Sequence, residues 1–521
     1  MGQQAAPQHG SKWTAAGIVM IGIFITLLDG TIVDVVLPKM MSSLNTDTYG
    51  VQWVIIAYLI AAAVSMTSVD WLGSVLGHRY TYLLGLLIFT FFSALCGQAH
   101  DIGFMVFSRF CQGIGEGIVV PIGMTILCEA FPEEERGMAL GVYGLGASCA
   151  PALGPTLGGI ITEHLSWRWI FYVNLPIGLL GMFLTLVVLW ETGAHNKMRV
   201  PFDVPGFLAM TVAFGSFITF LSKGQEKGWL QSDFILGLII VFCISMPLFI
   251  WIELNTEHPL FDLRIFRYRN FTLSVLCMFA MSAAIYGIFM MIPLYLERFR
   301  QFTTLTTGLT MLPGSIMAGV GVFVAGYLSD KYDPQKLFFL SSAFMFATGL
   351  ALSTIDMDTE RSRIILLFML WNIPLAFNFP PIQAIGFSGV PEDKISLVSC
   401  AQNASRLLAG SVGTAIAVTI LERRADLFFE SFGRHVAYDN ITAVTALRSL
   451  QGYLHFHGTP AQLLETKALK VLELYTTMKA YVYAVKSDIL WMTLIGLFAV
   501  VFCLFMKKQP SSHGVKHVPI H

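Results

Sequence analysis

Long apolar stretches alternate with short polar turns along almost the whole chain. Many of these stretches contain about 20 residues, the length that an α-helix needs to cross the hydrocarbon core of a bilayer. The pattern therefore predicts an all-α polytopic membrane protein with fourteen transmembrane helices, in groups of six, two and six. The predicted spans are 14–37, 51–72, 80–98, 103–128, 137–162, 169–190, 205–222, 233–253, 271–296, 305–328, 337–355, 364–389, 398–421 and 486–506.

The composition supports a membrane protein and argues against several other classes. Hydrophobic residues make up 55% of the 521 residues and charged residues only 12%, which is about half their share in an ordinary soluble domain. The net charge of −1 gives no reason to expect a nucleic-acid partner. Outside the spans the sequence shows no Ser-His-Asp order, metal-ligand cluster or phosphate-binding loop, so we expect neither enzymatic activity nor a bound metal.

The grouping of the spans predicts three parts. Residues 1–200 form an N-terminal six-helix bundle, residues 201–262 form two inserted linker helices, and residues 263–521 form a C-terminal six-helix bundle. An even number of crossings places both termini on one side of the membrane. Lys and Arg are more frequent in the short loops on that side, and the positive-inside rule makes it cytoplasmic. We therefore expect a multi-pass protein of the cell membrane with cytoplasmic termini.

One connection, residues 422–484, is too long for a turn and lies on the extracytoplasmic side in this topology. Thr459, Pro460 and Gln462 fit a capping box with proline at the first helical position, which predicts a helix start. An apolar stripe follows and leads into the last span: Leu464, Ala468, Val471, Tyr475, Met478 and Val482. Such a stripe either packs on the protein's own surface or docks a partner. The sequon at Asn440 matters only in a secretory-pathway host.

The first and fourth predicted spans carry four charged residues: Asp29, Asp34, Arg109 and Glu116. A charged side chain at bilayer depth costs roughly 2.5–3.5 kcal/mol, so such residues usually face a partner or a water-filled cavity. Arg109 and Glu116 share a helical face but lie about 10 Å apart, so each needs a partner from another helix. The two aspartates point about 140° apart, and we expect one to meet Arg109 while the other faces a cavity. A buried ion pair that only fixes helix register is the structural alternative.

The fifth predicted span is rich in glycine. Gly154, Pro155, Gly158 and Gly159 give it the spacing G-P-x-x-G-G. Glycine lets a neighbouring helix approach closely and proline bends a helix, so this segment is predicted to be a bend at a close helix contact. Packing alone would explain the glycines, whereas the joint spacing is more specific.

Several motifs of the first half recur together in one known family. They are Leu28-Asp29-x-Thr31-Ile32-Val33, Arg109 with Gln112-Gly113, the G-P-x-x-G-G segment, and Trp167-Arg168-Trp169-Ile170-Phe171 with Asn174, Pro176 and Gly178. In this order they resemble the major facilitator superfamily, in particular the 14-spanning drug/proton antiporters of the EmrB/QacA type. The resemblance covers essentially the whole chain.

The second half carries later motifs of the same family, with Tyr286, Asn403 and Arg406 at the positions expected to line the C-terminal bundle's cavity. The superfamily's cytoplasmic gate signature is matched in the second half by Gly326, Asp330 and Lys331. The equivalent segment of the first half departs from it, with Asp70 for the glycine, Ser74 for the aspartate and Val75 for the arginine. If that aspartate closes the cytoplasmic side in relatives, other contacts must close it here.

The resemblance implies two pseudo-symmetric bundles that rock about a midplane cavity, while an inward proton gradient drives export of lipophilic or cationic compounds. From their charge at membrane depth, we expect Asp34 and Glu116 to be protonatable or cation-binding acids, and Arg109 with Asp29 to be the charge pair that tunes them. Glu116 stands where the family usually has a small residue. The segment from Gly154 to Gly159 would be the hinge between the bundles. No cofactor beyond the coupling protons is expected. Relatives of the EmrB kind work with a periplasmic adaptor, and the 422–484 segment is the candidate contact.

Two other functions remain open from the sequence. The same scaffold serves exporters or importers of one specific metabolite, such as a siderophore or a fatty acid, because fold does not fix substrate. A non-transporting membrane sensor would keep the fold but not the coupling. The weakened first-half gate signature permits a sensor, whereas the retained acids and glycines favour a transporter.

Overall fold

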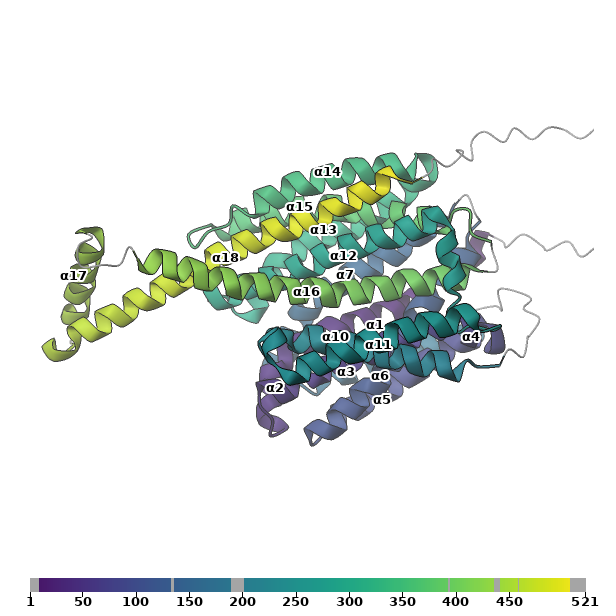
Figure 1. The fold of residues 1–521 in the computed structure, drawn as a ribbon, viewed down its shortest axis with the longest axis horizontal. Helices are drawn as coiled ribbons and strands as arrows, with labels where there is room; N and C mark the ends of the chain where they lie inside the picture. The colour runs from purple at the N-terminus through teal and green to yellow at the C-terminus, as the bar shows by residue number, and fades with distance from the viewer. Residues whose placement is uncertain are drawn as a thin grey trace, which may run out of the picture.

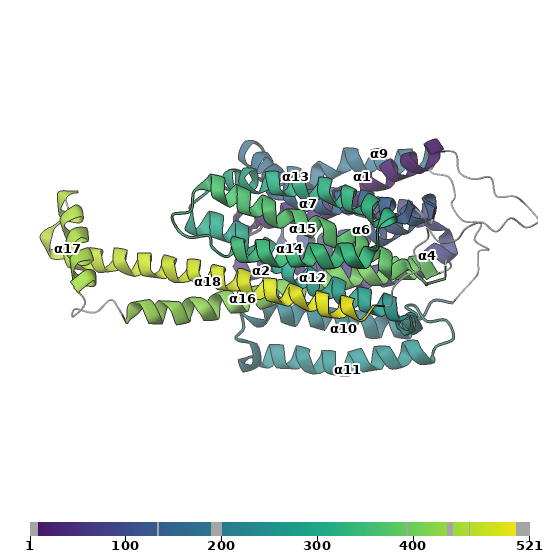
Figure 2. The same cartoon turned by 90° about the horizontal axis from the view of Figure 1, so that it is seen from above.

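The computed structural model describes residues 9–132, 135–188, 201–391, 394–434, 441–457 and 459–506. These residues form long helices joined by short turns, and most of the helices run along the long axis of the molecule (Figures 1 and 2). We call the end at which α1 begins and α18 ends the base. The opposite end, from which α16 and α18 project, is the arm end (Figure 2).

The N-terminal bundle is organised around α6, which packs against α1, α3, α5 and α7. Asp101 caps α6 by accepting a hydrogen bond of 2.9 Å from the Phe104 N–H, which satisfies one of the free donors of the first turn. The helices of this bundle are α1 (His9–Ser43), α2 (Thr48–Val51), α3 (Trp53–Thr67), α4 (Val69–Leu76), α5 (His78–Gln98), α6 (Ile102–Ala130), α7 (Arg136–His164), α8 (Trp169–Tyr172) and α9 (Asn174–Val187).

The C-terminal bundle is organised around α12, which packs against α15, α16 and α18, while α13 packs against α15. Its helices are α12 (Arg269–Leu294), η4 (Tyr295–Phe299), α13 (Thr304–Lys331), α14 (Pro334–Leu352), α15 (Arg361–Phe387), α16 (Ile395–Gly433), α17 (Ile441–Phe456) and α18 (Leu464–Leu504). The two linker helices, α10 (Val204–Gly224) and α11 (Asp233–Asn255), pair with each other. α10 contacts both α3 and α16, so this hairpin lies over the seam between the bundles.

The helices have the length and apolarity that membrane crossing requires. Within the part of the chain that the structure describes, 12 helices pass that test, and α3 with α4 forms one further candidate span that bends by 53°. The predicted span 51–72 is therefore a bent pair that breaks at Ser68. α7 does not pass the test, but it contains 29 residues and packs against α1 and α13. This arrangement is compatible with fourteen crossings and defines an all-helical membrane protein with two bundles.

The segment 422–484 is helical over most of its described length, where the sequence suggested a long connection. α16 continues to Gly433 and α18 is one unbroken helix of 41 residues, so both spans extend far beyond the bundles (Figure 2). We call residues 422–434, α17 and residues 464–484 the arm. Phe428 stacks on Phe432 and contacts Tyr483, which joins the two long helices at the foot of the arm.

One local prediction for this segment is wrong and another holds only in part. Thr459, Pro460 and Gln462 form no capping box, because a short 3₁₀ turn, η6 (Ala461–Leu463), precedes α18, and no side-chain hydrogen bond caps α18. The predicted stripe is confirmed only in part. Ala468 and Val482 of the stripe are buried, whereas Val471 and Tyr475 are exposed. Thr476 and Ala480, which the stripe did not include, are also buried on α18. Asn440 lies outside the described residues.

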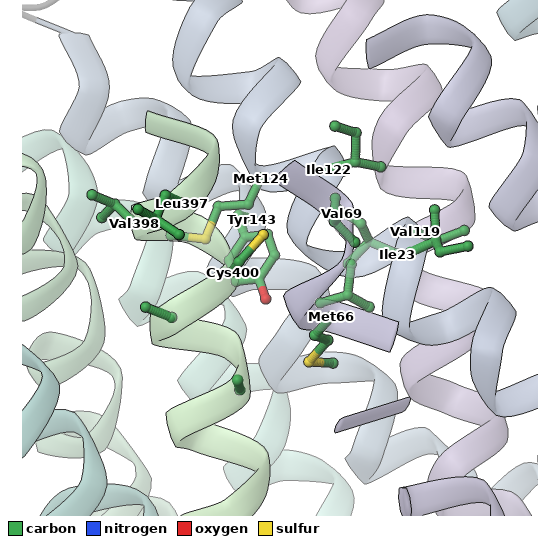
Figure 3. Packing of buried hydrophobic residues seen from close by; sticks show 14 of the residues in the cluster. Ile23, Met66, Val69, Val119, Ile122, Met124, Tyr143, Leu397, Val398 and Cys400 are labelled. Carbon is green, nitrogen blue, oxygen red and sulfur yellow. The ribbon is translucent and has the colours of Figure 1, made fainter. Parts of the chain in front are cut away.

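The bundles meet in a continuous apolar core. One cluster of buried side chains runs through the N-terminal bundle, the linker hairpin and the first turns of α16, and a second fills the C-terminal bundle. Figure 3 shows where the first cluster crosses the seam: Met124 of α6 and Tyr143 of α7 lie beside Leu397, Val398 and Cys400 of α16. The polar residues described next are embedded in this apolar packing.

Candidate functional site

Arg109 of α6 and Asp29 of α1 form an ion pair inside the N-terminal bundle. Both side chains are fully buried, and the guanidinium Nη1 of Arg109 donates to Asp29 Oδ2. The same Nη1 donates to Gln112 Oε1 at 2.9 Å. Of the two aspartates of the first span, Asp29 is thus the one that meets Arg109. A buried pair of this kind is costly to break, because the remaining charge has no compensation.

Asn174 completes the surroundings of Asp29. Its side-chain amide lies 2.7 Å from Asp29 Oδ1 and 3.1 Å from the Ser93 hydroxyl, and Ser93 donates to the Phe171 carbonyl at 2.9 Å. Both oxygens of Asp29 are therefore hydrogen-bonded. Asn174 belongs to the W-R-W-I-F-x-x-N motif, so three separate sequence motifs meet at one carboxylate. The motif identified Asn174, but no sequence signal assigned it this partner.

Tyr58 of α3 links the ion pair to Glu116, and sequence reasoning missed it. Its ring lies under the guanidinium of Arg109, 3.9 Å from the charge centre, which is a favourable cation–π geometry. Its hydroxyl lies within reach of the Glu116 carboxylate. Arg109 and Glu116 are thus connected through a side chain of another helix. A lone tyrosine in an apolar span gives no periodic signal that would have identified it.

Glu116 is oriented by the glycines around it. A Cβ on Gly113 would lie 2.4 Å from the Tyr58 carbonyl and one on Gly117 2.5 Å from the Ala62 carbonyl, so both glycines bring α6 against the α3 backbone. Gly115 contacts α5 in the same way, 2.5 Å from the Phe89 nitrogen. Glu116 is 5% exposed, and its Oε2 has no hydrogen-bond partner among the described residues. The cations whose charges act on it are Arg406 and Arg109.

Arg406 of α16 supplies the opposite charge from the C-terminal bundle. Its Nη1 donates to the Tyr286 hydroxyl at 3.3 Å and its Nη2 to Asn403 Oδ1 at 3.5 Å. Its Nε has no hydrogen-bond partner within the described part of the chain. The three residues predicted for the C-terminal bundle's cavity are thus one cluster. The charges of Glu116 and Arg406 act on each other from different bundles, and among the described residues the two side chains form no direct ion pair.

In the described part of the chain, two hydrogen bonds of Asn403 join this cluster to the N-terminal bundle. The Tyr143 hydroxyl donates to Asn403 Oδ1 at 2.6 Å, and the amide of Asn403 donates to the sulfur of Met124 at 3.2 Å. Both Tyr143 and Met124 belong to the N-terminal bundle and lie beside α16 in Figure 3. The sequence singled out Gly154, Gly158 and Gly159 of α7 but not this tyrosine nearer the start of the helix.

At the base, Asp330 of α13 closes the seam against α7. Its two carboxylate oxygens accept hydrogen bonds from the Gly137 and Met138 N–H groups at 2.7 and 2.9 Å. These are free donors at the start of α7, where a negative charge is favoured by the helix dipole. Gly326 lets the helices meet, because a Cβ there would lie 2.4 Å from the Gly137 carbonyl and 2.7 Å from Gly141 Cα. We call these contacts the base latch.

Two other residues of the gate signatures, Lys331 and Ser74, form hydrogen bonds within their own helices. Lys331 donates to the Tyr327 hydroxyl of its own helix and does not reach the N-terminal bundle in the described contacts. In the first half, Ser74 donates to the Trp71 carbonyl within its own turn at 2.7 Å. α4 still packs against α16 beside Cys400. The base is therefore closed on one side by the second-half signature and on the other by helix packing.

The G-P-x-x-G-G segment lies in α7, which continues through it as one helix. A Cβ on Gly154 would lie 2.2 Å from the Thr31 hydroxyl oxygen, so this glycine brings α7 against α1. Gly158 and Gly159 are buried, and their carbonyls accept from the Thr162 hydroxyl at 2.7 and 3.3 Å. The side chains of Pro155 and Asp34 lie outside the part of the molecule that the structure describes.

Two helical bundles with opposite charges facing each other across their seam, and a closed latch at one end, define a polytopic membrane transport protein. The sequence matches the profile described as Major Facilitator Superfamily over residues 19–414. The chain belongs to this superfamily. This confirms the fold class and the family that the motifs indicated.

Similar proteins also support membership of this superfamily. The chain is 30% identical over 402 residues to the multidrug resistance protein Stp of Mycobacterium tuberculosis, covering 77% of this chain and 74% of the relative. It is 28% identical over 459 residues to the multidrug export protein EmrB of Escherichia coli, covering 86% and 88%. Among solved structures, the human organic anion transporter MFSD10 is similar in fold, with a TM-score of 0.57 at 13% identity, over 94% of this chain and 99% of that one.

Proposed function

We propose that this protein exports lipophilic or cationic small molecules in exchange for protons. The observation that carries the proposal is the position of Glu116, a buried carboxylate with one unpartnered oxygen that faces Arg406 of the other bundle. The names of Stp and EmrB, a multidrug resistance protein and a multidrug export protein, support the choice of substrate class.

The arrangement suits coupling because the two bundles hold opposite charges that do not neutralise each other directly. A carboxylate in an apolar seam can bind either a proton or a cationic substrate, and Arg406 favours release of both because it is itself positive. When the bundles rock, the distance between Glu116 and Arg406 changes. The affinity of Glu116 for a proton therefore changes with the side to which the seam is open, which is the requirement for antiport.

Most of the other predicted site residues have roles other than proton binding in this proposal. Asp29 and Arg109, whose charges are already paired and hydrogen-bonded, act as a fixed support for Tyr58 and Glu116. The base latch at Gly326 and Asp330 holds one side closed while the other is open. Asp34 remains a second candidate acid. The segment from Gly154 to Gly159 acts as the hinge, since it brings α7 against α1 while the start of α7 contacts α13.

We further propose that the protein lies in the inner or plasma membrane of the cell. The base then faces the cytoplasm and the arm projects outward. The arm is then the candidate contact of a periplasmic adaptor. Its exposed apolar side chains, which include Leu474, Tyr475 and Phe456, support an interaction surface.

The experiment that tests this function measures the range of substrates. Purified protein in proteoliposomes is given several unrelated lipophilic cations, each with an imposed pH gradient. We expect the gradient to drive the movement of more than one of them. Movement of a single compound only would favour the exporter or importer of one metabolite, and no movement of any compound would favour a sensor.

A further inference from the structure

Two carboxylates, Asp203 and Glu253, lie close together where the linker hairpin reaches the base. They are separate from the site around Glu116 and Arg406. Asp203 caps α10, and its Oδ1 accepts a hydrogen bond of 2.9 Å from the Gly206 N–H. Glu253 lies in the last turns of α11, and its Oε2 accepts a hydrogen bond of 3.2 Å from the Phe261 N–H. Asp203 is 7% exposed and Glu253 is fully buried. Each carboxylate thus uses one oxygen to hold a backbone segment.

The second oxygens of the two carboxylates have no hydrogen-bond partner among the described residues. They are Asp203 Oδ2 and Glu253 Oε1, and both are buried. They converge on one point, because a Cβ on Gly206 would lie 2.4 Å from the first and 2.8 Å from the second. Glycine at this position leaves the space in which the two oxygens meet.

The charges around the pair do not compensate it. The charged groups that act on Glu253 are Asp203 and Asp262, and both are acidic. Asp262 is itself bound by Lys394 of the segment that leads into α16, at 2.9 Å. The guanidinium of Arg264 donates to the Leu254 carbonyl at 3.3 Å. Two ionised carboxylates at this site would repel each other, and two cations of this region within the described ranges, Lys394 and Arg264, already have partners.

We propose that Asp203 and Glu253 form a carboxyl–carboxylate pair that binds one proton between Asp203 Oδ2 and Glu253 Oε1. The proton comes from water and turns one of the two unpartnered acceptors into a donor, so both oxygens gain a hydrogen bond and the pair carries one negative charge. The two residues then share a single proton-binding equilibrium. This inference goes beyond the proposed function, because the pair lies outside the seam between the bundles.

The bound proton links Asp203 at the start of α10 to Glu253 near the end of α11. Glu253 also holds the segment around Phe261 that leads to α12, through its hydrogen bond to the Phe261 N–H. The unfolded chain has both carboxyl groups ionised at neutral pH, whereas the folded chain keeps one proton. The folded state therefore binds more protons, and its stability falls as the pH rises. This dependence is opposite to that of an acid held ionised by a salt bridge.

The test uses the full-length protein in lipid vesicles and compares wild type with Asp203→Asn and Glu253→Gln. In each variant the new amide N–H can donate to the remaining carboxylate, so no bound proton is needed. The infrared spectrum of wild type minus that of each variant, at neutral pH, should show the carbonyl band of a buried carboxylic acid. Other buried carboxyl groups, such as Glu116 and Asp488, are present in all three proteins and cancel in the difference. The matched control is Asp233→Asn, at the exposed start of α11, which should keep the acid, so its difference from wild type should lack the band.

Thermal unfolding gives a second readout that does not depend on transport. Between about pH 6 and pH 9 the unfolding temperature of wild type and of Asp233→Asn should fall by several degrees, and that of the two pair variants by less than half as much. The proposal is overturned if neither difference spectrum shows the band, or if the pH dependence of the two variants equals that of wild type. It is also overturned if Mg²⁺ or Na⁺ restores wild-type stability at alkaline pH, since the pair would then be a cation site.

Discussion

Tyr143 of the N-terminal bundle donates a hydrogen bond of 2.6 Å to Asn403 of the C-terminal bundle. Asn403 Oδ1 also accepts from Arg406, which faces Glu116. Asn403 Oδ1 is therefore bound both by Tyr143 of the other bundle and by Arg406 of its own bundle. The charge of Arg406 in turn acts on Glu116 of the N-terminal bundle. A movement of the bundles that separates Tyr143 from Asn403 must also change the surroundings of Arg406 and Glu116.

Tyr143→Phe should make the seam easier to open. It removes a hydrogen bond worth about 0.5–1.5 kcal/mol without changing the ring, so the population of base-open molecules should rise severalfold. Distances between spin labels on Tyr80 of α5 and Tyr332 after α13, both exposed at the base, measure that population. Tyr475→Phe on the exposed arm is the control and should leave the distances unchanged. An unchanged distance distribution in Tyr143→Phe would show that this hydrogen bond does not hold the seam.

The base latch gives a second prediction. Gly326→Ala places a Cβ against the backbone of α7 at Gly137 and Gly141, where a side chain cannot swing away. The closed base should be disfavoured by about 1–3 kcal/mol, and the labels on Tyr80 and Tyr332 should move apart. Gly237→Ala is the matched control, because a Cβ on Gly237 meets nothing within 4 Å. If both alanine variants gave the wild-type distances, the latch would not depend on close helix contact.

The ion pair of Asp29 and Arg109 predicts a non-additive effect on stability. Asp29→Ala leaves a buried guanidinium without its counter-ion and should lower the free energy of unfolding by about 3–5 kcal/mol. The double variant Asp29→Ala/Arg109→Leu removes both charges and should be more stable than Asp29→Ala alone. Thermal unfolding in detergent measures the difference. A double variant less stable than Asp29→Ala would mean that Arg109 contributes mainly through Tyr58 and Gln112.

The sequence was sufficient for the fold class and for part of the site, because both follow from burial of charge in a membrane. Long apolar stretches predicted the helices, and the cost of an unpaired Arg109 at depth predicted a carboxylate partner from the first span. Asn403, Arg406 and Tyr286 were identified through a family motif. Their mutual contacts were not predictable, since a motif does not state which side chains meet.

The remaining contacts depend on how helices are rotated against each other, which a single sequence does not encode locally. Tyr58 and Tyr143 are ordinary aromatic residues of apolar spans until α6 and α16 bring Arg109 and Asn403 beside them. The partial error on α18 has the same origin. The stripe correctly included Ala468 and Val482, but Val471 and Tyr475 are exposed and Thr476 is buried.

If the arm binds a partner protein, its removal should leave transport by the purified protein unchanged. Gly433 of α16 and Leu469 of α18 line the same cavity, so a short Gly-Ser linker can join them in place of residues 434–468. This variant keeps the contact of Phe428 with Tyr483 at the foot of the arm. Transport in proteoliposomes should be unchanged, whereas resistance of whole cells should be lost if the arm binds an adaptor. Full resistance in cells would remove the arm from the mechanism.

The most direct test of the central claim, that Glu116 couples proton movement to substrate export, is dye movement in proteoliposomes against an imposed pH gradient. Wild type, Glu116→Gln, Asp34→Asn and the control Glu163→Gln, whose side chain is exposed on α7, are compared at equal protein density. We predict that Glu116→Gln lowers gradient-driven movement by at least about tenfold and still equilibrates dye without a gradient, because only the protonatable group is lost. Glu163→Gln should match wild type. Full gradient-driven activity in Glu116→Gln would contradict the account, whatever the activity of Asp34→Asn.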